Sequence, residues 1–237
     1  DNLLKALRLS CRIILVGDSD QLPSIGAGNV LNDILSSELF PSIRLKKVFR
    51  QASQSKIITN AHAIINGENP DFSKKDSDCF FLKRYDSASV CNTVLELVKD
   101  RLPAAYGFDP IGDIQVLCPS RMLGTGTVNL NNLLQNSVNP KTHNMPQLSY
   151  KGIYFRVGDK VMQIKNNYDI QYKRDNGEYG TGVFNGDVGF ICDIDVRGGI
   201  LKVRYDDRVV IYYNEEIGQL ELAYAVTVHK SQGSEYD

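Results

Sequence analysis

The stretch DIQVLCPSR, residues 113–121, runs from an apolar half into a polar loop, and it decides the fold class expected for this chain. It predicts a strand that ends at the loop. Residues 128–134, VNLNNLL, then place apolar side chains at helical spacing, and residues 87–102 read as a helix opened by Ser87. A strand between two helices is typical of a parallel α/β layer.

Two other apolar stretches extend this pattern toward the N-terminus. Residues 12–16, RIILV, are a continuous run of Leu, Val and Ile after Arg, bounded by Gly17, which predicts a strand buried on both faces of a parallel sheet. Residues 79–85, CFFLKRY, predict another strand.

Helices are expected between these strands. Residues 29–37 predict a short helix. Residues 57–65 carry isoleucines at helical spacing, which predicts an amphipathic helix that begins at Ser53 or Ser55 and stops at Gly67.

The pattern of apolar and polar residues changes over residues 150–218. Short alternating runs are separated there by tight-turn signals at Asn185-Gly186 and Gly198-Gly199, which predicts a small SH3-like antiparallel β-barrel inserted into the α/β domain. Residues 173–182, KRDNGEYGTG, predict a mobile loop, and residues 219–228 again predict a strand.

Composition excludes several classes of protein. The 27 Lys and Arg nearly cancel the 28 Asp and Glu, so any contact with nucleic acid must be local. Five cysteines without a CxxC pair indicate neither a zinc site nor a disulfide framework, and no metal ligand is assigned. No stretch approaches the ~18 apolar residues of a membrane span, so we expect a cytoplasmic protein without a membrane partner.

Polar loops follow three of the predicted strands: GDSDQLP at 17–23, CPSR at 118–121 and HKSQGSE at 229–235. Ligands of open α/β sheets bind outside the carboxyl ends of the strands. The three loops are therefore expected to share one cleft.

Two stretches carry candidates for phosphate contacts. Gln21 cannot titrate but both donates and accepts hydrogen bonds, which suits a group that senses a phosphate, and Asp18 could hold its loop or a metal-bound water. Arg50, which follows an aromatic residue, could neutralise a γ-phosphoryl group. The alternatives are that Asp18 caps a turn, that Gln21 is a solvated loop residue and that Arg50 pairs with an acid on the surface. On Asp18 and Gln21 alone, the first two alternatives are favoured.

The stretch TVHKSQGSE after the last predicted strand suits a phosphodiester backbone. Thr227, His229 and Lys230 offer hydrogen-bond donors, Gly233 permits close approach, and Glu235 could accept from a ribose hydroxyl. A lone histidine at a strand end is more often structural, but a nine-residue, mostly polar run after a strand favours a binding role.

Together these stretches resemble the RecD-like DNA helicases of superfamily 1, the branch that moves 5′ to 3′ on single-stranded DNA. VGDSDQLPSIGAGNVL (16–31) resembles the family's motif III, VFRQ (48–51) its motif IV, and AYAVTVHKSQGSEYD (223–237) its motif V. GDKVMQIKNNYD (158–169) and VFNGDVG (183–189) lie where the family inserts its SH3-like subdomain. The resemblance covers essentially the whole chain.

The resemblance implies roles for individual residues. Gln21 would touch the γ-phosphate and Arg50 would be the arginine finger of the second RecA-like lobe. The nucleotide side would comprise Gly17, Asp18, Gln21, Arg50, Gly233 and Glu235. The DNA side would comprise Pro119, Ser120, Arg121, Asn185, Thr227, His229 and Lys230. Asn185 lies in an Asn-Gly-Asp turn that reads equally well as a plain hairpin.

The resemblance also implies a division into domains. Residues 1–45 would end the first RecA-like lobe, residues 46–149 would begin the second, residues 150–218 would be the barrel, and residues 219–237 would return to the second lobe. The expected piece is therefore the C-terminal fragment of an exonuclease V α-subunit-like helicase that serves DNA repair and recombination. Its partners would be single-stranded DNA and, as candidates, other exonuclease V subunits.

The sequence departs from the family in its phosphate-binding parts. It contains no G-x-x-x-x-G-K-[ST] loop, and GAGNVL at 26–31 only imitates a dinucleotide fingerprint. ATP and Mg²⁺ are thus expected in the intact protein, whereas this piece alone should bind neither and should not hydrolyse ATP.

Two other readings stay open. One is a non-catalytic nucleic-acid-binding or protein-binding module. The other is a related motor, either an RNA helicase or the helicase part of a conjugative relaxase.

Overall fold

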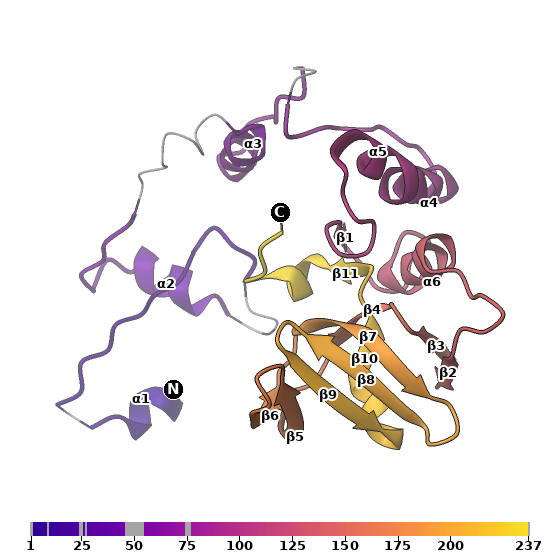
Figure 1. Ribbon diagram of the computed structural model, residues 1–237. Helices are drawn as coiled ribbons and strands as arrows, with labels where there is room; N and C mark the ends of the chain where they lie inside the picture. Colours follow the sequence, from indigo (N-terminus) through magenta and orange to yellow (C-terminus); the bar gives the residue numbers. More distant parts are fainter. Residues whose placement is uncertain are drawn as a thin grey trace. The chain divides into compact units, whose positions relative to one another are not determined.

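A computed structural model describes the chain except for residues 1, 9, 24–25, 27, 46–54, 74–76 and 237 (Figure 1). The chain divides into two compact units, Asp1–Lys83 and Arg84–Asp237. Each unit is described by itself. Within the described ranges no helix is both long and apolar enough to cross a membrane.

The first unit contains helices α1 (Asn2–Ala6), α2 (Val30–Ser36) and α3 (Lys56–Ile65). The last two confirm the helices predicted at 29–37 and 57–65. Ser55 is the N-cap of α3, and its hydroxyl accepts a hydrogen bond from the Ile58 amide at 3.4 Å. Such a cap satisfies one of the amides that the first turn leaves unpaired.

The predicted strands at 12–16 and 79–85 are wrong for this structure. Both segments are outside the strands that the described residues form, and Ile14 and Val16 are 79% and 93% exposed. A strand buried on both faces needs a paired strand on each side and helices above and below. The described residues of the first unit contain no strand that could pair with either segment. The apolar composition of 12–16 is therefore not sufficient to form a strand here.

The second unit begins with a long helical segment: α4 (Ser87–Glu96), a π-helical turn η2 (Leu97–Arg101) and α5 (Leu102–Tyr106). It confirms the helix predicted at 87–102, but its N-cap is Asp86 rather than Ser87. The Asp86 carboxylate accepts from the Ser89 amide at 2.8 Å and from the Ser89 hydroxyl at 2.6 Å.

A parallel pair of strands forms the centre of the α/β part. Strand β1 (Val116–Cys118) pairs with β11 (Ala225–Thr227), and Cys118 lies opposite Thr227. Helix α6 (Thr127–Val138) lies beside them (Figure 1). The buried Asn131 side chain fixes α6 to β11, because its oxygen accepts from the Ala225 amide at 2.8 Å and its nitrogen donates to the Ala225 carbonyl at 2.9 Å. This arrangement confirms the strand at 113–121 and the helix after it.

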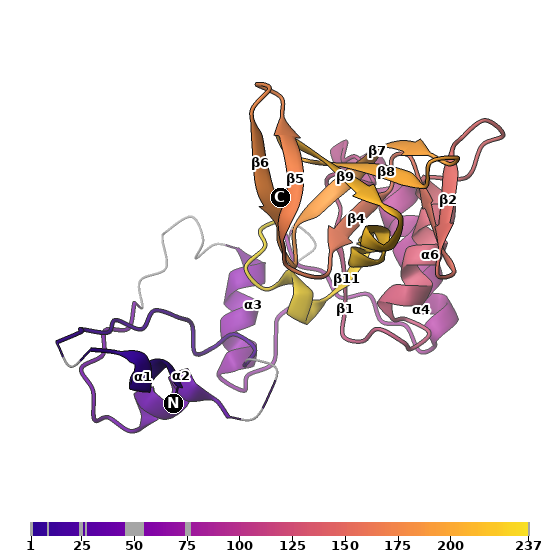
Figure 2. The ribbon, with the colours of Figure 1, turned by 90° about the horizontal axis from the view of Figure 1, so that it is seen from below.

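The chain between α6 and β11 forms an antiparallel sheet (Figure 2). It is preceded by a hairpin of β2 (Gln147–Tyr150) and β3 (Ile153–Arg156). The sheet has the order β10-β4-β7-β8-β9-β5-β6. Its strands are β4 (Lys160–Gln163), β5 (Asn167–Arg174), β6 (Tyr179–Val183), β7 (Val188–Asp195), β8 (Ile200–Tyr205), β9 (Arg208–Tyr213) and β10 (Leu220–Leu222), with the 3₁₀ helix η3 (Asn214–Gln219) before β10. The segment predicted as one strand at 219–228 is thus divided between two sheets.

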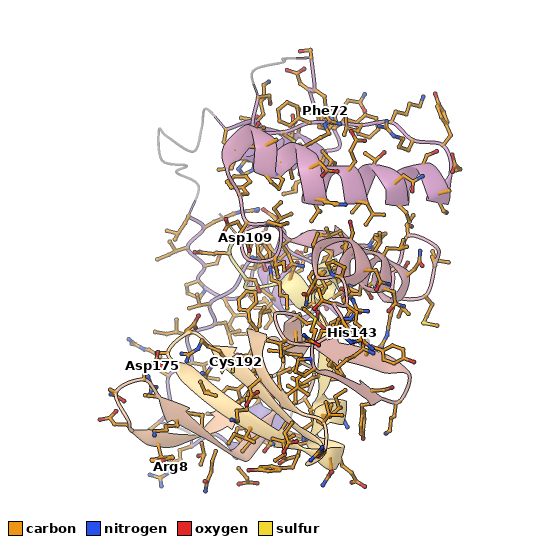
Figure 3. The ribbon with its side chains drawn as sticks, turned by 45° about the vertical axis from the view of Figure 1, so that its right-hand side comes forward. Arg8, Phe72, Asp109, His143, Asp175 and Cys192 are labelled. Atoms are coloured by element: carbon orange, nitrogen blue, oxygen red, sulfur yellow. The ribbon has the colours of Figure 1, made fainter. Side chains whose placement is uncertain are left out.

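Residues 173–182 form a hairpin between β5 and β6, not the predicted mobile loop. The Arg174 amide donates to the Glu178 carbonyl at 2.8 Å, and the Gly177 amide donates to the Arg174 carbonyl at 2.9 Å. Gly177 has a φ of +89°, which a side chain would make unfavourable. Asp175 lies in this turn (Figure 3) and pairs with Arg204 at 2.8 Å. The Asn176-Gly177 pair is a hairpin signal, which the polar composition of the segment concealed.

The core of the sheet is apolar, with Val161, Ile191, Leu201, Val203 and Val210 fully buried. Three buried polar side chains in this core are joined by hydrogen bonds. The Tyr205 and Tyr212 hydroxyls lie 2.8 Å apart, and Tyr212 donates to the Gln163 side-chain oxygen at 3.0 Å. Burial raises the pKa of both tyrosines, so both stay neutral and can share hydrogen bonds.

Asp159 connects the sheet to the α/β part. One carboxylate oxygen accepts from Gln135 at 2.6 Å and from the Arg156 amide at 2.7 Å. The other accepts from Asn139 and from the Tyr224 hydroxyl, both at 2.8 Å. Burial raises the pKa of this carboxyl, while the four hydrogen bonds act in the opposite direction. This buried acid therefore helps to fix the sheet against α6, together with Asn131, which donates to the Leu222 carbonyl of β10 at 2.9 Å.

Candidate nucleic-acid interface

Two of the three predicted polar loops lie at one edge of the α/β part. Because β1 and β11 are parallel and Cys118 lies opposite Thr227, the loops that follow them leave the pair in the same direction. The third loop, residues 17–23, belongs to the other compact unit. The structure thus brings CPSR and HKSQGSE together.

The loop after β1 is held against the start of α6. The Thr127 amide donates to the Ser120 carbonyl, and the Val128 amide donates to the Arg121 carbonyl, both at 3.2 Å. A Cβ at Gly126 would lie 2.5 Å from the Arg121 carbonyl oxygen, so this turn requires glycine. Pro119 is exposed, whereas the Ser120 hydroxyl oxygen is buried with no hydrogen-bond partner among the described residues. The backbone is fixed, and the Arg121 side chain extends from it.

The loop after β11 is a 3₁₀ turn, η4 (Val228–Ser231). The Thr227 hydroxyl caps it by accepting from the Lys230 amide at 3.4 Å. His229, Gly233 and Glu235 are exposed. Sequence reasoning selected all of these residues, and they lie on one short segment.

An acid that sequence reasoning missed lies between the two loops. The Glu221 carboxylate, on β10, pairs with Arg121 at 2.5 Å through one oxygen and with Lys230 at 3.7 Å through the other. Leu220 and Leu222 on either side of it are buried. Strand alternation places Glu221 on the opposite face from these leucines, and that pattern is the only sequence signal that could have selected it.

These groups border a small pocket of about 30 Å³. Its lining residues include Arg121, Thr127, Asn131, Glu221, Thr227 and Lys230. A volume of this size has room for a water molecule. The edge is therefore an exposed set of cations and hydroxyls around one carboxylate, which suits contacts with single oxyanions of a phosphate backbone.

Asn185 lies in the turn between β6 and β7. Its amide donates to the Asn166 side-chain oxygen at 2.9 Å, and the neighbouring Gly186 amide donates to the Gln163 carbonyl at 2.9 Å. Asp187 accepts from the Phe184 amide at 3.1 Å and pairs with Arg208 at 3.0 Å. These contacts hold a turn between two strands that do not pair with each other, because β6 pairs with β5 and β7 pairs with β4 and β8, so the plain-hairpin reading of this turn is wrong.

In the first unit, Asp18 caps a turn. It accepts from the Asp20 amide at 2.9 Å and from the Gln21 side-chain nitrogen at 3.3 Å. Asp20 pairs in turn with Arg44 at 2.8 Å. Gln21 is exposed and Gly17 precedes the turn. This geometry agrees with the alternative in which Asp18 caps a turn, and a nucleotide contact of Gln21 stays a prediction.

The residues predicted to contact ATP are divided between the two compact units. Arg50 lies outside the described residues, so its predicted position is untested. In the part of the chain that the structure describes, no group of three His, Cys, Asp or Glu side chains could hold a metal ion. Gly233 and Glu235 are exposed. The nucleotide contacts of these residues stay predictions.

Two family models match parts of the chain. Residues 130–205 match the SH3 domain of ATP-dependent RecD-like DNA helicases, and residues 1–79 match an AAA domain. The first match confirms the predicted SH3-like insert in an α/β fold of the RecA-like type.

Relatives of known name match almost the whole chain. It is 33% identical over 235 residues to the ATP-dependent RecD2 DNA helicase of Deinococcus radiodurans. That alignment covers 99% of this chain and 29% of the relative. It is 27% identical over 248 residues to the RecBCD enzyme subunit RecD of Mycobacterium tuberculosis. That alignment covers 99% of this chain and 40% of the relative. The chain thus spans less than half of the length of these two relatives. A Bacteroides Pif1 helicase crystallised with ADP-AlF3 and single-stranded DNA aligns with 93% of this chain and 53% of its own, at 18% identity and a TM-score of 0.45.

Proposed function

We propose, for a chain that belongs to the RecD-like helicase family, that the intact protein is an ATP-dependent DNA helicase that moves 5′ to 3′ along single-stranded DNA. The observation that carries this proposal is the edge at which the loops after β1 and β11 meet, with Arg121 and Lys230 on one carboxylate. The relatives named above are described as helicases or as a helicase-complex subunit, which supports the same activity.

In this proposal the edge holds the phosphodiester backbone. Arg121 and Lys230 supply charge, and Thr227 and His229 supply further donors. Pro119 and Ser120 shape the first loop, and Asn185 would reach the strand from the β6–β7 turn. Backbone contacts carry no sequence information, as a motor that moves along any sequence requires. Since the chain as a whole has a net charge of −1, these local cations would provide the attraction.

ATP would act between two RecA-like lobes of the intact protein. Residues 1–45 would end the first lobe and residues 46–149 would begin the second, which residues 219–237 rejoin after the barrel of 150–218. Gln21, near Gly17 and Asp18, would sense the γ-phosphate, Arg50 would neutralise charge on it, and Gly233 and Glu235 would border the nucleotide. The sequence contains no Walker A loop, so the piece alone is proposed not to hydrolyse ATP.

Partners follow from the same proposal. Single-stranded DNA would be the track. The Mycobacterium tuberculosis relative is named a subunit of the RecBCD enzyme, so other exonuclease V subunits are candidate protein partners, in repair or recombination.

The test is unwinding of duplexes by the intact protein. We expect ATP-dependent unwinding of a duplex with a 5′ single-stranded tail and little unwinding of one with a 3′ tail. A variant with Arg121→Ala and Lys230→Ala should bind single strands roughly tenfold more weakly, with a flatter salt dependence. Lys202→Ala is the matched control, because Lys202 pairs with Asp193 at 2.9 Å on the barrel sheet.

Two outcomes would contradict the proposal. Binding of single strands without ATP-dependent unwinding would favour the non-catalytic binding module. Unwinding of RNA in preference to DNA would favour the RNA helicase.

A further inference from the structure

Glu221 connects the insert to the edge that is proposed to hold DNA. It lies on β10, the last strand of the antiparallel sheet, whereas Arg121 follows β1 and Lys230 follows β11. Each oxygen of its carboxylate faces one of the two cations, at 2.5 Å for Arg121 and 3.7 Å for Lys230. One acid thus holds both loops.

The carboxylate has the charge and geometry of a bound phosphate. A phosphodiester also offers one negative charge on two oxygens, and arginine and lysine bind both kinds of oxyanion. Two threonines, Thr127 and Thr227, line the same pocket. The place between Arg121 and Lys230 is therefore a site for an oxyanion, and a side chain of the protein already fills it.

A strand of DNA can reach this place only in competition with Glu221. The side chains of Arg121 and Lys230 are 57% and 32% exposed, so both are open to an incoming strand, and Glu221 is 24% exposed. The Glu221 carboxylate already contacts both cations, so a phosphate that binds the same two cations must take its place. Two anions would also repel each other there.

We propose that Glu221 is an internal competitor of the DNA backbone, which occupies the phosphate position between Arg121 and Lys230 until a strand displaces it. The inference rests on the proposed function, because it assumes that these two cations contact DNA. Competition lowers the affinity for single strands and speeds their release. A motor that must repeatedly release its track benefits from both effects.

The test is binding of a fluorescein-labelled oligothymidylate to the intact protein without ATP. Glu221→Gln keeps the size of the side chain and removes the competing charge. We expect it to bind the strand about threefold to tenfold more tightly, the range expected for two partly exposed ion pairs. Its affinity should also fall more steeply with salt, because the freed cations exchange counterions for phosphates.

Two further variants make this result specific. Asp193→Asn removes one negative charge from an ion pair elsewhere on the same sheet, and its affinity should equal that of the wild type. Glu221→Asp keeps the charge but withdraws it by one methylene, so it should tighten binding less than Glu221→Gln does. If Glu221→Gln does not fold, as judged by circular dichroism, Glu221→Asp decides the question alone.

The outcomes separate this inference from the function on which it rests. Unchanged or weaker binding by Glu221→Gln, with weaker binding after loss of Arg121 and Lys230, would overturn the competitor role and leave the DNA interface intact. An unchanged affinity for the oligothymidylate after loss of both cations would overturn the proposed interface, and the inference with it.

Discussion

At the scale of single residues, Asp159 is the side chain whose loss should damage this fold most. It accepts hydrogen bonds from Gln135, Asn139, the Arg156 amide and Tyr224. We expect Asp159→Ala to lower the free energy of unfolding by about 3 to 5 kcal/mol, because it leaves buried donors without an acceptor. Urea denaturation followed by circular dichroism measures this change.

A matched control keeps that result specific to burial. Asp193→Ala removes an acid from an exposed pair with Lys202, and its urea midpoint should stay close to that of the wild type. Equal losses for the two variants would contradict the structural role of Asp159.

At the scale of elements, the first turn of α4 makes a prediction about pH. Hydrogen bonds from the Ser89 side chain and then from its amide hold the pKa of Asp86 below its ordinary value of 3.8. A lowered folded pKa stabilises the protein above the unfolded pKa, and this stabilisation is lost as the pH falls through the folded value. Asp86→Ala should therefore lower the melting temperature at pH about 6, and the difference from wild type should shrink toward pH about 3.

Ser87 is the control for this cap. Sequence reasoning placed the start of the helix there, but its side chain makes no cap hydrogen bond in the structure. Ser87→Ala should melt close to the wild type at both pH values. A larger loss of stability in Ser87→Ala than in Asp86→Ala would contradict the assignment of Asp86 as the N-cap.

Elements also differ in how far the sequence could predict them. The helices α3 and α6 and the strand β1 follow from local patterns, because caps and apolar spacing act within the element itself. Residues 12–16 have the composition of a buried strand, yet a strand exists only where another strand pairs with it. Glu221 was missed for a similar reason, since its contact with Arg121 joins residues 100 positions apart in the sequence, which no local pattern can predict.

At the scale of the whole molecule, the buried apolar core belongs to the second unit. Every side chain of the main hydrophobic cluster lies between Cys91 and Ala225. Among the described residues of the first unit, large apolar side chains such as Ile14, Val16 and Ile43 are exposed. Since burial of apolar surface is the main favourable term in folding, the two units should differ strongly in stability.

Amide hydrogen exchange of the chain, read out by mass spectrometry, tests this difference. We expect strands β7 to β9 and helix α6 to exchange slowly, through openings that approach global unfolding, and residues 12–16 to exchange almost as fast as an unfolded peptide. Asp159→Ala should speed exchange in α6 and in β4 while leaving residues 12–16 unchanged, because the lost contacts lie within the second unit. Slow exchange in 12–16 would contradict this prediction and would mean that these residues have found a strand partner after all.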